Sequence, residues 1–83
     1  MEVWVEELVI SADSELTGET VGDIDVRRRF GVTLVAVRHR EGPAGKRGST
    51  VIPDASTYLQ AGDELIVLGT RESLAQLEAI ACR

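Results

Sequence analysis

The sequence predicts a small α+β domain in which helices pack on a mostly antiparallel sheet, in the order β-α-β-β-β-α. Short runs of β-branched and aliphatic residues, separated by turn-forming segments, indicate the strands. Two segments with apolar residues at helical spacing, each preceded by a threonine, indicate the helices. At 83 residues, with 43% hydrophobic and 28% charged residues, the chain fits one domain over residues 1–83.

The first strand and the first helix are predicted from the N-terminal third. Residues Val3–Ile10 are rich in β-branched residues and indicate a strand that stops at a turn-forming stretch. Thr20 can accept hydrogen bonds from early helical amides, so we expect a short helix from there to about Arg29. Gly31 can take the left-handed conformation that ends many helices.

The middle of the chain predicts the central strand. Val32–Val37 is apolar on both alternating faces, which is typical of a strand covered on both sides. Arg38 to Thr50 is a polar, glycine-rich stretch without periodicity and is expected to form a long loop. Val51–Pro53 indicates a short extended piece at a sheet edge, because proline cannot donate to a ladder.

The last strand and the last helix complete the sheet and its cover. Ala61–Asp63 predicts a tight turn, and Glu64–Leu68 predicts a buried strand that closes at Gly69. Thr70 is a suitable N-cap for an amphipathic helix. The apolar face of that helix comprises Leu74, Leu77 and Ile80 or Ala81.

Charge and cysteine content narrow the class of function. The net charge of −5 argues against binding of nucleic acid. No lysine or arginine precedes Arg27, and most basic residues lie between Arg27 and Arg47, so a local anion site is compatible with the acidic chain. Cys82 is the single cysteine, which excludes an intrachain disulfide and favours a reducing cytoplasm. The apolar runs are too short to cross a bilayer.

Catalytic and metal-binding constellations are not apparent. The sequence has no nucleophile elbow and no phosphate-binding loop, so we do not expect an enzyme. His39 is the single histidine and is assigned a structural or solvent-exposed role, with a ligand contact as the alternative. Asp13, Asp23 and Asp25 lack calcium-loop spacing and are interpreted as caps and surface charges, so no metal is expected.

Two aromatic residues and the three arginines at the end of the first helix have structural explanations. Trp4 and Tyr58 are interpreted as core or interface anchors. Arg27, Arg28 and Arg29 lie where the negative end of the helix dipole favours cations, and capping alone can explain them.

The order and spacing of several short motifs resemble the C-terminal domain of the RCK family, also called TrkA-C. The match runs from about Glu6 to Glu78. The residues that carry it are Leu16-x-Gly18-x-Thr20-Val21-x-x-Ile24-x-Val26-Arg27-x-x-Phe30-Gly31-Val32, then Val35-Ala36-Val37-x-Arg or a near equivalent, Ile52-Pro53, and Leu59-x-Ala61-Gly62-Asp63-x-Leu65-x-Val67-x-Gly69.

The resemblance implies a homodimer that binds a small anionic ligand, with cyclic di-AMP as the best candidate, between its two copies. Val21 and Gly22 would approach the bases, and Arg27 would contact a phosphate. Thr33 and Leu34 fall on further contact positions, and Ile52 and Pro53 would form the wall against the adenine. A two-fold dinucleotide suits a two-fold interface.

The resemblance also implies a cytoplasmic regulator, peripheral to the membrane, of a potassium channel or cation/proton antiporter. The Gly-x-Gly-x-x-Gly fingerprint is absent, so neither NAD nor any other cofactor is expected. The long loop would add phosphate contacts, dock on a partner or have no role in binding, and the residues that could contact phosphate are Arg38, His39, Arg40, Lys46 and Arg47. Two alternatives remain: a ligand-free dimerisation or adaptor module, and an amino-acid-sensing regulatory domain.

Overall fold

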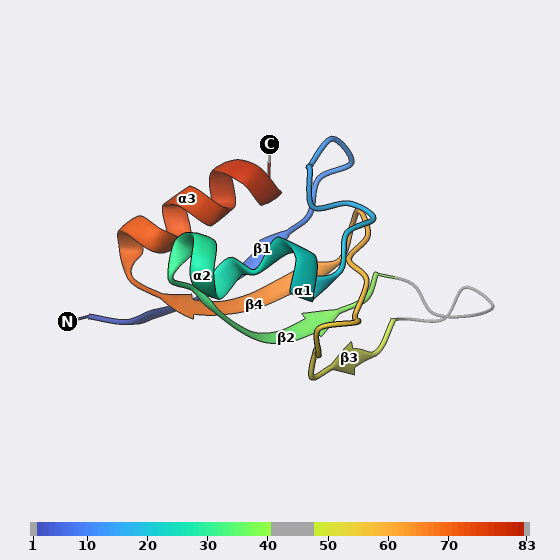
Figure 1. The fold of residues 1–83 in the computed structure, drawn as a ribbon, viewed down its shortest axis with the longest axis horizontal. Helices are drawn as coiled ribbons and strands as arrows, with labels where there is room; N and C mark the ends of the chain where they lie inside the picture. Colours follow the sequence, from blue (N-terminus) through green and yellow to red (C-terminus); the bar gives the residue numbers. More distant parts are fainter. Residues whose placement is uncertain (1, 41–47, 83) are drawn as a thin grey trace.

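The computed structural model, which describes residues 2–40 and 48–82, has helices on one face of a four-stranded antiparallel sheet (Figure 1). The predicted α+β order is confirmed. The sheet order is β1-β4-β2-β3, so the last long strand lies between the first two. The strands are β1 (Trp4–Val9), β2 (Thr33–Arg38), β3 (Thr50–Val51) and β4 (Glu64–Gly69).

The predicted first helix is two short helices, so the expectation of one continuous helix to Arg29 was wrong. Helix α1 (Val21–Ile24) ends and helix α2 (Val26–Phe30) begins at Asp25, whose φ of 49° is left-handed. Aspartate tolerates this conformation better than most residues because its short polar side chain bonds locally. The Asp25 carboxylate accepts a hydrogen bond from the Arg28 amide at 3.4 Å, so one residue ends α1 and caps α2.

The predicted helix caps are confirmed. The Thr20 hydroxyl accepts from the Asp23 amide at 3.2 Å, and the Thr70 hydroxyl accepts from the Ser73 amide at 3.2 Å. Thr70 thereby begins helix α3 (Arg71–Ala81). Gly31 has a φ of 73° and its amide donates to the Arg27 carbonyl, which ends α2.

The core lies between the sheet and the helices. Leu74, Leu77 and Ala81 of α3 are buried in it, as predicted, and Ile80 packs against it. Val32, immediately before β2, is fully buried. Trp4 and Tyr58 are 42% and 61% exposed, so neither is a core residue. The other buried core residues are Leu8, Ile10, Leu16, Ile24, Val26, Val37, Leu59, Leu65 and Val67.

The central strand β2 is interior to the sheet but is not covered on both faces, so that part of the prediction was wrong. The helices lie on one side of the sheet only (Figure 1). The register against β4 shifts between Leu34 and Ala36, and Val35, at this irregularity, is 43% exposed. A bulge places an extra residue outside the ladder, which an alternation pattern cannot register.

The predicted loop between Arg38 and Thr50 is only partly described. Arg38 belongs to β2 and Thr50 belongs to β3, and the two residues pair in register. Lys46 and Arg47 lie outside the described residues. Among the described helices, none has the length and apolar character needed to cross a bilayer.

Candidate functional site

A groove of about 310 Å³ lies where α1, α2, the start of β2 and the segment after β3 meet. All the predicted ligand residues except Ile52 line it, although they come from three separate parts of the sequence. We call it the α1–β2 groove. Its lining residues are Val21, Gly22, Asp25, Val26, Arg27, Thr33, Leu34, Pro53, Asp54 and Ala55.

Close approach of the backbone at Gly22 holds the two walls of the groove together. The Gly22 amide donates to the Ala55 carbonyl at 2.9 Å, and the Val21 amide donates to the Thr57 carbonyl at 2.9 Å. A Cβ at position 22 would lie 3.0 Å from the Ala55 oxygen and 3.1 Å from its Cβ. Glycine is therefore the residue that fits here, because any side chain pushes α1 away from the opposite wall.

The opposite wall is a turn organised by Asp54. Its Oδ1 accepts from the Ser56 amide at 2.9 Å and from the Ser56 hydroxyl at 2.7 Å. The Ser56 hydroxyl and amide, followed by Thr57, lower the pKa of the Asp54 carboxyl below its ordinary value, because these donors favour the charged form. Asp54 is thus a stable anion on the rim of the groove, and the turn presents the Ala55 carbonyl to Gly22.

Arg27 is the basic residue of the groove. It is exposed, and its guanidinium has no ion pair within residues 2–40 and 48–82. Its neighbour Arg29 instead lies over the Phe30 ring, 5.0 Å from the centroid. Of the predicted arginine cluster, Arg27 is therefore the member that lines the groove with its charge unpaired, which leaves its planar fork of donors free for an anion.

Two further predicted contact residues, Thr33 and Leu34, line the groove, whereas Ile52 does not. Thr33 is exposed and Leu34 is half-buried, and both line the groove at the start of β2. Ile52 is 82% exposed and does not line the groove of its own copy, so its predicted contact with the adenine stays a prediction. The strand β3 ends at Val51, directly before Ile52.

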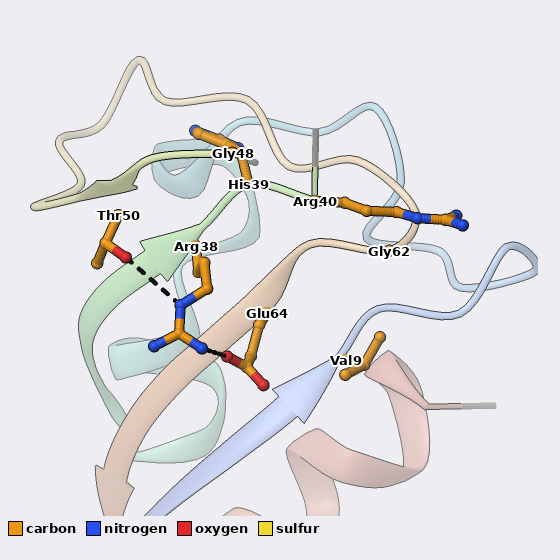
Figure 2. Close-up of a pocket in the computed structure, with 8 residues that line it drawn as sticks. All are labelled: Val9, Arg38, His39, Arg40, Gly48, Thr50, Gly62 and Glu64. Carbon is orange, nitrogen blue, oxygen red and sulfur yellow. Dashed lines mark hydrogen bonds and ion pairs between the residues drawn. The ribbon is translucent and has the colours of Figure 1, made fainter. Parts of the chain in front are cut away.

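A second, larger cavity of about 540 Å³ lies at the other end of β2 (Figure 2). Arg38 contacts Glu64 at 2.6 Å, and its Nε donates to the Thr50 hydroxyl at 3.4 Å. Arg40 extends past Gly62, away from Arg38, so the two guanidinium groups do not converge (Figure 2). We call it the polar cavity. Its lining residues are Val9, Arg38, His39, Arg40, Gly48, Thr50, Gly62 and Glu64.

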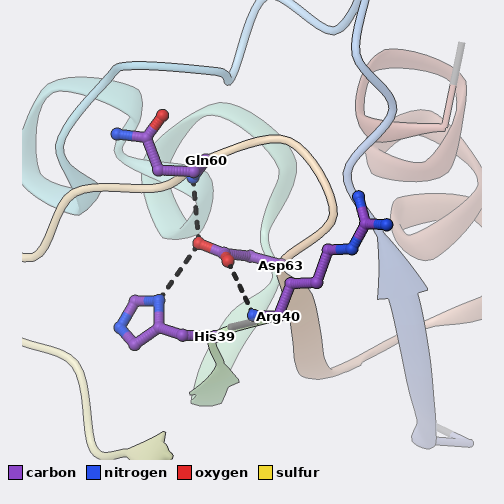
Figure 3. A network of polar contacts seen from close by, with 4 residues as sticks. All are labelled: His39, Arg40, Gln60 and Asp63. Carbon is purple, nitrogen blue, oxygen red and sulfur yellow. Dashed lines mark hydrogen bonds and ion pairs between the residues drawn. The ribbon is translucent and has the colours of Figure 1, made fainter. Parts of the chain in front are cut away.

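Beside the polar cavity, the buried Asp63 carboxylate joins the end of β2 to the turn before β4 (Figure 3). It accepts from the Gln60 amide at 2.9 Å and the Arg40 amide at 3.2 Å, and His39 Nδ1 lies 3.1 Å away. From the sequence, Asp63 was predicted only to be part of a tight turn. His39 therefore has a structural contact, consistent with the first of its two predicted roles, and buried polar groups of this kind require such partners.

The described part of the chain, residues 2–40 and 48–82, contains no group of three or more histidine, cysteine or acidic side chains placed to hold a metal ion. The fold thus defines a small α+β domain whose groove brings together apolar side chains, Arg27 and the two aspartates Asp25 and Asp54.

This domain belongs to a known family. The model of the TrkA-C domain matches residues 5–81, which is nearly the whole chain, so the protein is a member of the TrkA-C family. The resemblance drawn from the sequence motifs is confirmed.

Two curated relatives contain this domain as a minor part. The Ktr system potassium uptake protein C of Bacillus subtilis is 35% identical over 71 residues, covering 83% of this chain and 28% of the relative. An uncharacterized transporter of Rhodopirellula baltica is 28% identical over 69 residues, covering 83% of this chain and 12% of the relative. The chain therefore spans less than a third of either relative.

Solved structures share the fold. The RCK C domain of the potassium transport protein KtrA in complex with cyclic di-AMP has a TM-score of 0.76 and 26% identity, and the match covers 94% of this chain and 82% of that chain. The RCK_C domain dimer of S. agalactiae BusR with cyclic di-AMP has a TM-score of 0.79 at 24% identity, covering 94% and 89%. BusR has also been solved with its promoter DNA, and that match has a TM-score of 0.79 at 24% identity and covers 94% of this chain and 35% of the BusR chain.

Proposed function

We propose that the domain regulates a potassium channel or a cation/proton antiporter by binding a small anionic ligand, cyclic di-AMP in the first instance, between two copies of the chain. The observation that carries the proposal is the α1–β2 groove, in which apolar walls and the unpaired Arg27 lie together. Two solved structures with this fold, those of KtrA and BusR, contain cyclic di-AMP, which supports the choice of ligand.

The chemistry of the groove fits a nucleotide with one phosphate near Arg27. Guanidinium offers charge-assisted, bidentate hydrogen bonds to phosphate oxygens. Val21, Leu34 and Pro53 supply apolar surface for a base. The Asp25 and Asp54 carboxylates flank the same groove, so a ligand with dense negative charge, such as a triphosphate, fits less well than one with a single charge per phosphate.

The homodimer part of the proposal is supported by the position of Ile52. This side chain is 82% exposed beside the groove and contributes nothing to it within one copy. An exposed isoleucine next to a ligand site is explained if it covers a base held by the partner copy. The site would then be complete only in the dimer, which matches the two-fold symmetry of the dinucleotide.

Regulation would follow from this arrangement. A ligand that contacts both copies stabilises the relative orientation in which both grooves face it, and shifts the population of dimer states by its differential affinity. A cytoplasmic location beside the membrane transporter, a single regulatory domain over residues 1–83, and the absence of catalysis, a cofactor and a nucleic-acid partner belong to the same proposal.

The proposal is tested by thermal stabilisation of the parent chain and three variants with cyclic di-AMP, AMP, ATP and a panel of amino acids. Arg27→Ala should weaken binding of cyclic di-AMP by about tenfold to a hundredfold, because a hydrogen bond to a charged group contributes about 1.5–3 kcal/mol. Arg27→Lys should recover part of the loss. Arg28→Ala is the matched control and should bind like the parent, since Arg28 does not line the groove.

If only amino acids stabilise the chain, the natural ligand is an amino acid and not cyclic di-AMP. The absence of stabilisation by any compound, in a chain that still dimerises, would favour the ligand-free adaptor. If Arg27→Ala and Arg28→Ala lose affinity for cyclic di-AMP equally, Arg27 has no specific role in binding.

A further inference from the structure

Within residues 2–40 and 48–82, the outer edge of β1 pairs with no other strand and lies at the end of the sheet farthest from β3. Among the described elements, β1 pairs with β4 on one side and contacts α3 on the helical face. At its C-terminal end, the Cys82 thiol donates to the Val9 carbonyl at 3.2 Å, so this end of the edge is occupied. The segment before Val9 exposes backbone groups that can pair with another strand.

The side chains of β1 are apolar at its ends and acidic in its middle. Val5 and Val9 are 64% and 52% exposed, and Val3, just before the strand, is 54% exposed. Glu6 and Glu7 lie between them, and neither carboxylate has an ion pair among residues 2–40 and 48–82. The edge therefore offers apolar contact at both ends and two free negative charges at the centre.

The charges of Glu6 and Glu7 indicate whether β1 pairs with a second copy of itself or with a strand of another protein. In any two-fold antiparallel pairing centred on β1, Glu6 or Glu7 of one copy faces Glu6 or Glu7 of the other, because the two residues are adjacent. Like charges directly opposite in a sheet are destabilising. The two acids thus protect the edge from self-association, and the same two charges attract a strand of opposite sign.

We propose that β1 is a docking edge for an extended segment of another protein that carries two consecutive basic residues between β-branched residues. Such a segment adds a fifth strand by antiparallel pairing. Because successive side chains in a strand point to opposite faces, its two basic residues fall on opposite faces of the sheet, as Glu6 and Glu7 do. The inference is independent of the ligand, since β1 does not line the α1–β2 groove.

The probe is the synthetic peptide acetyl-Thr-Val-Thr-Lys-Lys-Val-Thr-Val-amide, titrated into the isotope-labelled chain and followed by amide chemical shifts. The expected changes are centred on residues 4–8. The Lys-Lys peptide should bind about tenfold more tightly than its Glu-Glu counterpart, because two favourable cross-strand ion pairs replace two repulsive ones. A Lys-Lys peptide with N-methylated backbone amides keeps its charge but should bind at least tenfold more weakly.

Two protein variants separate strand pairing from general electrostatic attraction. The double variant Glu6→Lys/Glu7→Lys should exchange the preference, binding the Glu-Glu peptide and rejecting the Lys-Lys peptide. The matched control Glu15→Lys/Glu19→Lys changes the net charge equally at exposed positions outside β1 and should bind like the parent.

Equal binding of the N-methylated peptide, shift changes spread over other acidic surfaces, or the same loss in both double variants would overturn the proposal. The two double variants should both retain binding of cyclic di-AMP. Failure of the ligand to bind the parent chain would count against the proposed function and leave the peptide result unaffected.

Discussion

An arginine lines the cavity at each end of β2, and the two arginines have different partners. At the polar cavity, Arg38 contacts Glu64 at 2.6 Å, and the buried Asp63 accepts two backbone amides and lies against His39. At the α1–β2 groove, Arg27 has no ion pair among residues 2–40 and 48–82, and the apolar side chains of Val21, Leu34 and Pro53 line the groove beside it. The polar cavity is the larger of the two, yet Arg38 already has a carboxylate partner and Asp63 beside it has three donors, and only the Arg40 guanidinium of this cavity has no ion pair within residues 2–40 and 48–82.

This contrast teaches that volume alone does not identify a binding site. A charged group that already has short contacts inside the chain must lose them to bind a ligand, and that loss offsets the gain. Arg27 loses only water. The contrast therefore favours the groove as the site of the proposed ligand and a structural role for Arg38 and the residues around Asp63.

The largest expected effect comes from Asp63→Asn. Asparagine keeps the size of the side chain but replaces one acceptor oxygen by a donor, which then faces backbone amides that also donate. Because Asp63 is only 3% exposed, we expect the free energy of unfolding to fall by about 2 kcal/mol. Urea denaturation measures the change, and the exposed Asp13→Asn serves as the control. An unchanged midpoint for Asp63→Asn would remove the structural role of this network.

A smaller effect on stability, and a larger effect on binding, is expected for Gly22→Ala. The added Cβ would lie 3.0 Å from the Ala55 oxygen, so α1 and the opposite wall must separate. We expect a loss of about 1 kcal/mol in stability and of about tenfold in affinity for cyclic di-AMP. Ala55→Gly in the same chain removes one of the two close contacts and should recover part of the affinity. A variant that binds like the parent would show that the spacing of the walls is not required.

The smallest effect concerns the rim of the groove. Asp54 has a lowered pKa because Ser56 donates to it, so Ser56→Ala should raise that pKa toward the ordinary value of 3.8. A carboxyl whose pKa is lower in the folded chain than in the unfolded chain stabilises the fold when the pH is above its unfolded pKa. This stabilisation is lost as the pH falls through its folded pKa. The contribution of the turn should therefore disappear only below about pH 4. Titration of the Asp54 carboxyl carbon by NMR checks this, and identical curves for parent and variant would contradict it.

Much of the fold follows from local patterns. Thr20, Gly31 and Thr70 mark helix ends by chemistry that acts within four residues, and these signals were sufficient. The break at Asp25 was not predicted because aspartate is compatible with both a helix and a left-handed residue. The irregularity at Val35 was missed because alternation assumes a regular ladder.

The groove residues were predicted through the family resemblance, whereas the network around Asp63 was not predicted. Val21, Arg27 and Leu34 were selected through the family resemblance, and the fold brings them to one groove. Asp63 was not recognised as a hub because its partners His39 and Arg40 are distant in the sequence and meet it only through the pairing of β2 with β4. The sequence signal that could have identified this role is an aspartate at the end of a turn, directly before a strand predicted to be buried.

The central claim is that the groove binds one cyclic dinucleotide between two copies of the chain. Isothermal titration of the purified chain with cyclic di-AMP, with sedimentation of the same samples, tests it most directly. The account predicts saturable binding at one dinucleotide per two chains, together with a dimer in the bound state. Binding at one ligand per chain in a monomer, or no binding at millimolar concentration, would contradict it.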